Sequence, residues 1–249
     1  MKRKRVGLLA VLLAAIVICS AAAFLLVYNG AVLLNNPSKS LYPVRGVDVS
    51  AYQGEIDWPV LVSQDIQFAF IKATEGSGYI DPYFESNFTN AAAANLRIGA
   101  YHFFSYDSGG KTQAENFISA VEKKSGMLPP VVDVEFYADK EKNPPQAQAV
   151  YEELSVMLTE LEAYYGVKPI IYATEKSYKL YIANQFNGYD IWIRNVTGRP
   201  TLFDKREWTF WQYTNRERLD GYNGEERFID MNVYNGSFAE FEHYNSVVK

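Results

Sequence analysis

Two carboxylic acids, Asp133 and Glu135, stand two positions apart in the apolar segment Val131-Val132-Asp133-Val134-Glu135. Side chains two apart on a β-strand share a face, and at ~3.3 Å per residue these two lie about 7 Å apart along the strand. Close carboxylates repel each other when ionised, so one of them tends to stay protonated near neutral pH. A proton donor beside an anion is what cleavage of a glycosidic bond requires, so the pair indicates acid catalysis on a glycoside.

A structural role is the alternative for these acids, because ion-pair networks also gather carboxylates. The cations available for such pairs are Lys72, Arg45 and Arg194. A D-x-E pattern alone decides little between the two roles. Its position at the end of an apolar strand-like segment that begins with Pro129-Pro130 favours catalysis.

Further polar residues interrupt apolar runs near the ends of other predicted strands: Asp48, Ser50, Lys72, Glu75, Gln212, Asp230 and Asn232. In β/α barrels the active site lies at the C-terminal ends of the strands. We therefore expect four acids to converge on one rim of such a barrel: Asp48, Asp133, Glu135 and Asp230.

The elements that would position these residues form a regular series. Eight β-rich segments are predicted as strands, at Arg45–Val49, Phe68–Ala73, Ile98–Phe103, Pro130–Phe136, Pro169–Ala173, Asp190–Val196, Thr209–Tyr213 and Arg227–Tyr234. About five segments are predicted as helices, at Trp58–Gln64, Phe84–Leu96, Lys111–Lys124, Gln146–Tyr165 and Glu175–Asn184. Strand–helix alternation predicts a parallel sheet with crossover helices, and eight strands suggest a barrel.

The length of the chain argues for an irregular barrel. A regular β/α barrel takes about 250 residues, whereas residues 42–249 number 208. The last three predicted strands also follow one another with short loops. We therefore predict an α/β fold, a TIM-like barrel that lacks helices in its C-terminal part.

The N-terminus has a different composition. Lys2-Arg3-Lys4-Arg5 is followed by an uncharged apolar run from Val6 to Val27, long enough for a membrane-spanning helix. A cleaved signal peptide usually has a shorter core, of about 7–15 residues, so we favour an uncleaved anchor with its basic end in the cytoplasm. We expect residues 1–27 to form a signal-anchor, residues 28–41 a linker, and residues 42–249 an extracellular domain, or a secreted one if the anchor is cleaved.

Charge and cysteine usage exclude several partners. Five of the 24 basic residues and none of the 29 acidic ones lie in residues 1–41, which leaves 19 basic and 29 acidic residues, a net charge of −10, in the rest. Such a surface repels nucleic acid. The single cysteine, Cys19, lies in the apolar run, and His102 and His243 are far apart, so we expect no disulfide in the domain and no metal or other cofactor.

Several short motifs together resemble one known family, glycoside hydrolase family 25, the Chalaropsis-type muramidases. The resemblance runs from about Arg45 to Phe241 and is specific in its order and spacing. It is carried by Arg45-Gly46-Val47-Asp48-Val49-Ser50 with Tyr52-Gln53-Gly54, Phe70-Ile71-Lys72-Ala73-Thr74-Glu75-Gly76 with Tyr79, Gly99-Ala100-Tyr101-His102-Phe103, Val132–Glu135, Ile171-Tyr172, Trp211-Gln212-Tyr213 and Asp230-Met231-Asn232.

The resemblance implies an eight-stranded barrel with few helices and a lysozyme activity, cleavage of the β-1,4 bond between N-acetylmuramic acid and N-acetylglucosamine in peptidoglycan. It implies that Glu135 is the general acid, Asp133 the second carboxylate, and Asp48 and Asp230 acidic partners. Positions that line the family's groove match Lys72, Tyr79, Tyr101 and Tyr172. We add Gln212 from its strand position, and Trp211 as a residue that could either stack on a sugar or be buried in the barrel.

The sequence leaves the mechanism open between direct attack by a carboxylate, inversion through water, and attack by the substrate's own 2-acetamido group. We favour the last, with Asp133 orienting the acetamido group.

The chain departs from the family pattern at Arg194 and Asn195, where a small residue usually follows Trp-Ile or Trp-Val. A chitinase-like barrel hydrolase and a non-catalytic wall-binding protein are the competing hypotheses. We expect a monomer whose partners are glycan strands and, through its N-terminus, a membrane.

Overall fold

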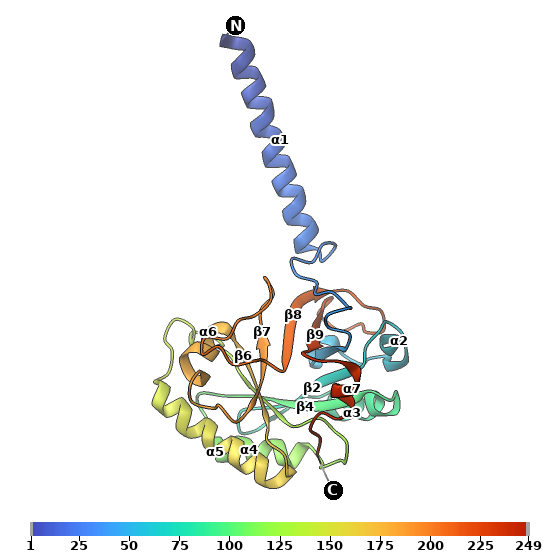
Figure 1. The fold of residues 1–249 in the computed structure, drawn as a ribbon, viewed down its shortest axis with the longest axis vertical. Coiled ribbons are helices and arrows are strands. Elements are labelled where there is room, and N and C mark those ends of the chain that lie inside the picture. The colour runs from blue at the N-terminus through green and yellow to red at the C-terminus, as the bar shows by residue number, and fades with distance from the viewer. Residues whose placement is uncertain (1, 248–249) are drawn as a thin grey trace.

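The computed structural model describes residues 2–247, and within them an N-terminal helix is followed by a closed β/α barrel (Figure 1). The helix α1 (Lys2–Tyr28) projects away from the barrel, and none of its residues from Val11 to Tyr28 is buried. Its segment Val11–Tyr28 has a mean hydropathy of 2.7. By length and composition α1 could cross a membrane, and a signal sequence would have the same properties.

Eight strands close the barrel: β1 (Arg45–Val49), β2 (Phe68–Glu75), β4 (Arg97–Phe103), β5 (Val131–Val134), β6 (Ile170–Thr174), β7 (Asp190–Arg194), β8 (Phe210–Glu217) and β9 (Ile229–Tyr234). Closure comes from the parallel pairing of β1 with β2, and the neighbouring strands from β2 through β8 are also parallel. The predicted barrel with eight strands is therefore confirmed.

The last strand departs from the expected parallel arrangement. β9 follows β8 through a hairpin and runs antiparallel to both β8 and β1. The reversal places the first residues of β9, not its last, at the end of the barrel where the other strands finish. Asp230 therefore stands opposite Asp48 in the register of β1 and β9.

Most of the helices that follow β1 lie outside the barrel, between its strands: α2 (Trp58–Val62), α3 (Phe84–Ala93), α4 (Gly110–Ala120), α5 (Ala147–Tyr165) and α6 (Glu175–Ser177). The helix α7 (Phe238–Glu242) follows β9, and its Phe241 packs in the inner core against Phe68 and Phe210. The predicted helix at Glu175–Asn184 is instead the short α6 followed by a π-helical turn, Tyr178–Ile182. A two-residue strand, β3 (Tyr79–Ile80), and the helix α7 were not predicted from the sequence, since both are very short.

Alternation along the strands divides the apolar residues into two cores. Outward-facing residues such as Val47, Ile71 and Val132 pack against the helices in the larger core. The inner core contains four interlocked rings, Phe68, Phe70, Trp192 and Phe210, which we call the aromatic floor. Glycine at position 99 makes room for one of these rings, because a Cβ there would lie 2.7 Å from the Phe70 side chain.

Residues 29–41, which follow α1, are not a free tether in this structure. Asn35 donates from its side-chain amide to the backbone carbonyl of Tyr213 at 3.3 Å, and the carbonyl of the buried Pro37 accepts a hydrogen bond from Arg45. An ion pair joins Lys39 to Asp65 at 2.5 Å. The segment between helix and barrel is therefore attached to the domain at several points.

Candidate active site

The two acids of the D-x-E pattern lie at the end of β5 and line the same cleft. Asp133 is inside the strand and only 6% exposed, and Glu135 follows the last strand residue. Their neighbours Val132 and Val134 belong to the outer core. The alternation of the strand thus turns both carboxylates away from the helices and into the barrel mouth.

Asp48 and Asp230 complete the cluster from β1 and β9. One oxygen of Asp48 accepts hydrogen bonds from the side-chain amides of Gln212 and Asn232, both at 2.8 Å. The same amide nitrogen of Gln212 also donates to Asp230 at 3.0 Å. These bonds hold two acids of neighbouring strands together, and we call the set Asp48, Asp133, Glu135 and Asp230 the acidic rim.

Burial controls the protonation of the acidic rim. Desolvation raises the pKa of Asp48 to about 6, against the hydrogen bonds from Asn232 and Gln212, which lower it. Desolvation also raises the pKa of Glu135 above its usual range and that of Asp133 and Asp230 well above theirs. For Asp133 the neighbouring charge of Glu135 adds to the effect. The rim can therefore hold protons near neutral pH, as a proton donor requires.

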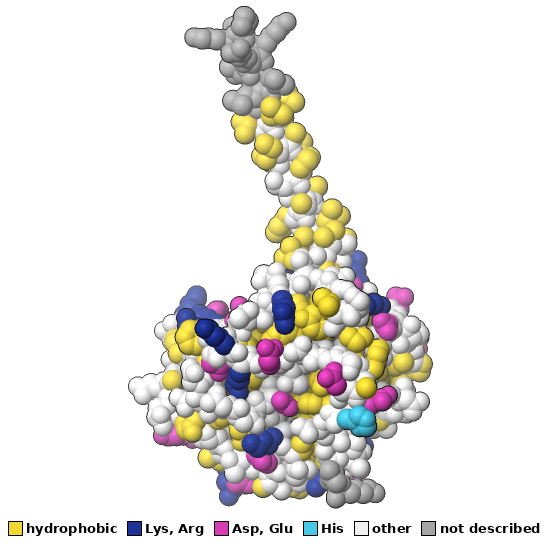
Figure 2. All heavy atoms as spheres, viewed as in Figure 1, with side chains coloured by type: hydrophobic (Ala, Val, Ile, Leu, Met, Phe, Trp, Pro, Cys, Tyr) yellow, Lys and Arg dark blue, Asp and Glu magenta, His cyan; other side chains and the backbone are white. Residues whose placement is uncertain are grey.

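The acidic rim opens into a cleft of about 1060 Å³. Four of the residues predicted to bind substrate line this cleft together with the acids: Lys72, Tyr101, Tyr172 and Gln212. The Tyr172 hydroxyl donates to the Gln212 side-chain oxygen at 3.0 Å, so this amide links a groove tyrosine to two acids. In Figure 2, acidic and basic side chains lie interspersed on the barrel face beside the apolar helix.

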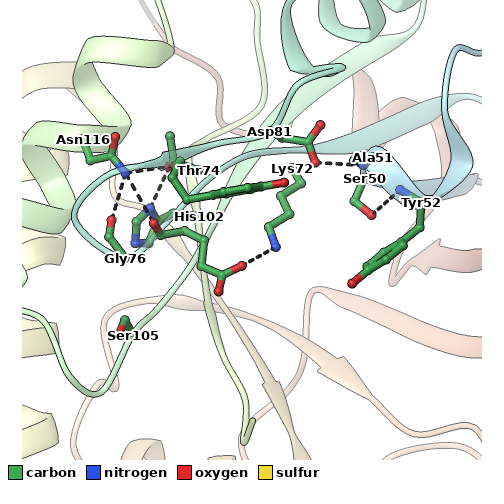
Figure 3. A network of polar contacts seen from close by, with 12 residues as sticks. Ser50, Ala51, Tyr52, Lys72, Thr74, Gly76, Asp81, His102, Ser105 and Asn116 are labelled. Carbon is green, nitrogen blue, oxygen red and sulfur yellow. Dashed lines mark hydrogen bonds and ion pairs between the residues drawn. The ribbon is translucent and has the colours of Figure 1, made fainter. Parts of the chain in front are cut away.

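Lys72 is held on one side of the cleft by a short ion pair. Its Nζ lies 2.7 Å from a carboxylate oxygen of Glu75, the contact drawn from Lys72 in Figure 3. The same Nζ lies 4.9 Å from the centre of the Phe103 ring. The Tyr79 ring lies 5.5 Å from the same Nζ, but Tyr79 is 46% exposed and is not among the residues that line the cleft. The structure thus places Tyr79 outside the cleft, next to Lys72.

Trp211 requires a correction, because it faces away from the cleft. It is 1% exposed and belongs to the outer core, where its ring contacts Trp208, Tyr42 and Tyr213. Its indole nitrogen donates to the backbone carbonyl of Asn195 at 2.8 Å. Of the two roles left open for Trp211, the structure shows burial, and its place among the predicted substrate-binding residues is wrong because Gln212, its neighbour on β8, takes the inward-facing position.

His102 is a buried structural residue. Its Nδ1 lies 2.7 Å from the Thr74 hydroxyl (Figure 3). Its Nε2 lies 3.1 Å from the side-chain oxygen of Gln113. Burial lowers the pKa of His102 to about 4, so the ring is neutral at physiological pH. Within residues 2–247, no group of three or more His, Cys, Asp or Glu side chains has the arrangement of a metal site.

Several residues of the cleft were not predicted as site residues, among them Trp192, Tyr52 and Tyr28. Trp192 donates from its indole nitrogen to Asn232 at 2.7 Å and so supports the amide that binds Asp48. Tyr52 lines the cleft with a 64% exposed side chain, and Tyr28 at the end of α1 lines it as well. The tyrosine at position 52 stands in a motif of the family resemblance, which was the available signal. For Tyr28 the sequence held none.

Comparison with known proteins agrees with this geometry. The model of the family described as glycosyl hydrolases family 25 matches residues 47–222. The chain belongs to glycosyl hydrolase family 25. The solved structure of a family 25 glycosyl hydrolase from Bacillus anthracis is 55% identical, with a TM-score of 0.80, over 84% of this chain and 96% of that one.

Two further relatives of this family 25 hydrolase carry the name lysozyme. The structure of the bacterial lysozyme from Streptomyces coelicolor is 30% identical, with a TM-score of 0.69, and the match covers 80% of this chain and 95% of that one. Lysozyme M1 from Streptomyces globisporus is 32% identical over 218 residues, 79% of this chain and 69% of the relative. The chain is a glycoside hydrolase, as predicted.

Proposed function

We propose that this family 25 hydrolase is a muramidase that cleaves the β-1,4 bond between N-acetylmuramic acid and N-acetylglucosamine in peptidoglycan. One observation carries the proposal: the acidic rim, with raised pKa values, lines one large cleft at the barrel mouth. Relatives named lysozyme and N,O-diacetylmuramidase support the choice of glycan. A purely structural set of ion pairs is disfavoured, because none of the four acids forms a salt bridge within the described residues.

Glu135 is assigned as the proton donor to the glycosidic oxygen. It stands beyond the end of β5, where the cleft gives a substrate access, and desolvation raises its pKa so that the protonated form persists. Asp133 is more deeply placed, and its Oδ1 is buried without a hydrogen-bond partner among the described residues. An unpartnered oxygen at the inner end of the cleft suits a contact with a substrate N–H group.

We assign to Asp133 the orientation of the 2-acetamido group, whose carbonyl oxygen then attacks the anomeric carbon as Glu135 protonates the leaving oxygen. Water then attacks the anomeric carbon of the resulting oxazolinium ion from the opposite face, so that the two displacements together keep the anomeric configuration in the product. Asp48, whose pKa is raised to about 6, is ionised above that pH and then supplies negative potential facing the oxocarbenium-like transition state, while Asp230 is held beside it by the Gln212 amide. A glycan strand that lacks the acetamido carbonyl is expected to resist cleavage, whereas equal cleavage of that strand would contradict the substrate-assisted route.

We also propose that α1 anchors the enzyme in the cytoplasmic membrane with the barrel outside. The apolar length of α1 and the Lys2–Arg5 cluster support an anchored topology. A membrane tether would favour local opening of the wall over bulk lysis. Fractionation of producing cells tests this: barrel and helix should be recovered together with membranes, and recovery only from the culture medium would count against the anchor.

The experiment that tests the activity is digestion of purified peptidoglycan by the full chain in mild detergent, with Glu135→Gln as the matched variant. Wild type should release soluble fragments whose new reducing ends, after borohydride reduction, are muramic acid. The variant should be slower by about 10²–10⁴-fold, the contribution typical of a general acid, at an unchanged melting temperature. New glucosamine reducing ends would refute muramidase specificity, and equal inertness of both proteins that still bind the wall would refute catalysis.

A further inference from the structure

Arg194 occupies an inward-facing position at the last residue of β7. On this strand Trp192 belongs to the inner core, whereas Ile191 and Ile193 belong to the outer core. Arg194 therefore continues the inward face one step above the aromatic floor, and it lines the cleft. This is the position at which the family resemblance leads us to expect a small residue.

Arg194 differs from the other cations of the cleft in having no partner. Lys72 pairs with Glu75 and Lys176 pairs with Glu141, whereas Arg216 and Arg227 donate to the backbone carbonyl of Tyr28. Within residues 2–247, neither an ion pair nor a side-chain hydrogen bond engages the guanidinium of Arg194. The side chain is half-buried, so its five donors meet a partly desolvated space.

The neighbouring strands explain why the guanidinium stays free. Arg194 lies on β7, which pairs with β6 on one side and β8 on the other. In this register Arg194 stands beside Thr174 of β6 and Gln212 of β8. The Thr174 hydroxyl is used in the cap of α6 with Ser177, and the Gln212 amide is used by Asp48 and Asp230. Both flanking side chains are thus occupied, and the arginine faces the space that a substrate would fill.

We propose that Arg194 is a specificity-determining residue that binds a carboxylate on the muramic acid side of the glycan. This rests on the proposed function. A planar guanidinium binds a carboxylate through two parallel hydrogen bonds, a geometry that a neutral amide cannot match. The carboxylate has two sources in peptidoglycan: the lactyl group of muramic acid that bears no peptide, or the stem peptide where one is attached.

The surrounding charges explain why such a residue would be needed. A carboxylate that enters a cleft lined by the acidic rim is repelled by every rim acid that is ionised. A guanidinium in that cleft offsets the repulsion at one position. Arg194 is close enough to the rim for its charge to lower the pKa of Asp48, Glu135 and Asp230, each of which burial raises.

The test measures kcat/KM of the full-length enzyme on pairs of glycans that differ only in the carboxylate. The first pair consists of peptide-free glycan strands that carry the lactyl carboxylate and the same strands after that carboxylate has been converted to a methylamide. The second pair is peptide-bearing strands before and after the same conversion of their peptide carboxyls. The variants are Arg194→Met, which keeps an unbranched apolar stem but removes the guanidinium and its charge, and Arg194→Lys. Melting temperatures verify that both variants fold.

We expect wild type to prefer one carboxylate glycan over its methylamide by about 10- to 100-fold, the range for hydrogen bonds to a charged group, and the pair that shows the preference identifies the source. In Arg194→Met the ratio should fall towards 1, and Arg194→Lys should keep part of it because the charge remains. If the ratio of kcat/KM between the carboxylate glycan and its methylamide is the same in wild type and in Arg194→Met, the proposal is overturned. If wild type cleaves none of the glycans, the proposed muramidase function fails as well.

Discussion

The two levels of the barrel interior contrast sharply, although the same strands build both. On β2, β7 and β8 an aromatic residue of the floor is followed two positions later by a polar residue of the cleft, as in Phe70 and Lys72 or Phe210 and Gln212. The floor consists of interlocked rings with no charge, whereas the level above holds four acids with raised pKa values, of which Asp133 is buried and the other three are half-buried.

Residues that stabilise the fold and residues proposed to carry the chemistry therefore lie only two positions apart on the same strand. Burying an aromatic side chain stabilises the fold, whereas burying an ionised carboxylate costs free energy. The aromatic floor therefore offsets the cost of the acidic rim that stands on it. Substitutions at the two levels should consequently have opposite effects on stability, and this expectation can be tested.

The largest expected change in stability is a loss at the floor. Phe70 is fully buried and contacts Phe68, Trp192 and Phe210. Phe70→Ala should lower the free energy of unfolding by about 3–5 kcal/mol, because it leaves a cavity among rigid rings. Denaturant unfolding measures the loss. The matched control is Phe238→Ala, at a position 49% exposed, which should change stability by less than about 0.5 kcal/mol.

The second expected effect is a gain of stability at the rim, with a defined pH dependence. Because burial raises the pKa of Asp48 from 3.8 to about 6, the folded state binds more protons than the unfolded state between these values. The contribution of Asp48 to stability is therefore fully present below pH 4 and is lost as pH rises through 6. Asp48→Asn should be more stable than wild type at pH 7, by up to about 3 kcal/mol.

Melting curves between pH 4 and pH 8 check this prediction. The advantage of Asp48→Asn should shrink towards zero at pH 4, while the activity of the variant falls at every pH. Asp220→Asn, at an exposed position, provides the control and should show no such pH-dependent advantage. A constant difference between Asp48→Asn and wild type would mean that the buried charge is not its cause.

The smallest expected effect concerns the outer face of β8. Trp211→Phe removes the indole hydrogen bond to Asn195 and some buried area, so stability should fall by about 1–2 kcal/mol. The rate of peptidoglycan cleavage should stay within twofold of wild type, because Trp211 lies outside the cleft. A large loss of activity with an unchanged melting temperature would return Trp211 to the list of sugar-binding residues.

Most of the fold could be predicted from the sequence, because long apolar segments with clear periodicity define the elements. β1 has the predicted bounds, and the helix predicted at Gln146–Tyr165 begins one residue later. The short β3 and α7 carried too few residues for a periodic signal. The π-helical turn after α6 and the reversed β9 depend on tertiary packing, and neither has a signature in local sequence.

The candidate site was predictable where alternation along a strand was applied, and the prediction failed where alternation was ignored. Asp133 and Glu135 line one cleft, as their spacing of two residues requires. Trp211 and Gln212 are adjacent on β8, so both could not face the cleft, and only Gln212 does. The position of Asp230 in its strand already predicted a place on the rim, but its pairing opposite Asp48 follows from the antiparallel β9, which the spacing did not reveal.

The measurement that tests the account most directly is a crystal structure of Glu135→Gln with a bound muramic acid–glucosamine oligosaccharide. We expect the scissile glycosidic oxygen within hydrogen-bond distance of the side chain at position 135. The acetamido group of the muramic acid should contact Asp133, with its carbonyl oxygen facing the anomeric carbon. An oligosaccharide bound with its glycosidic oxygen remote from position 135, or outside the cleft, would contradict the assignment of the acidic rim as the catalytic centre.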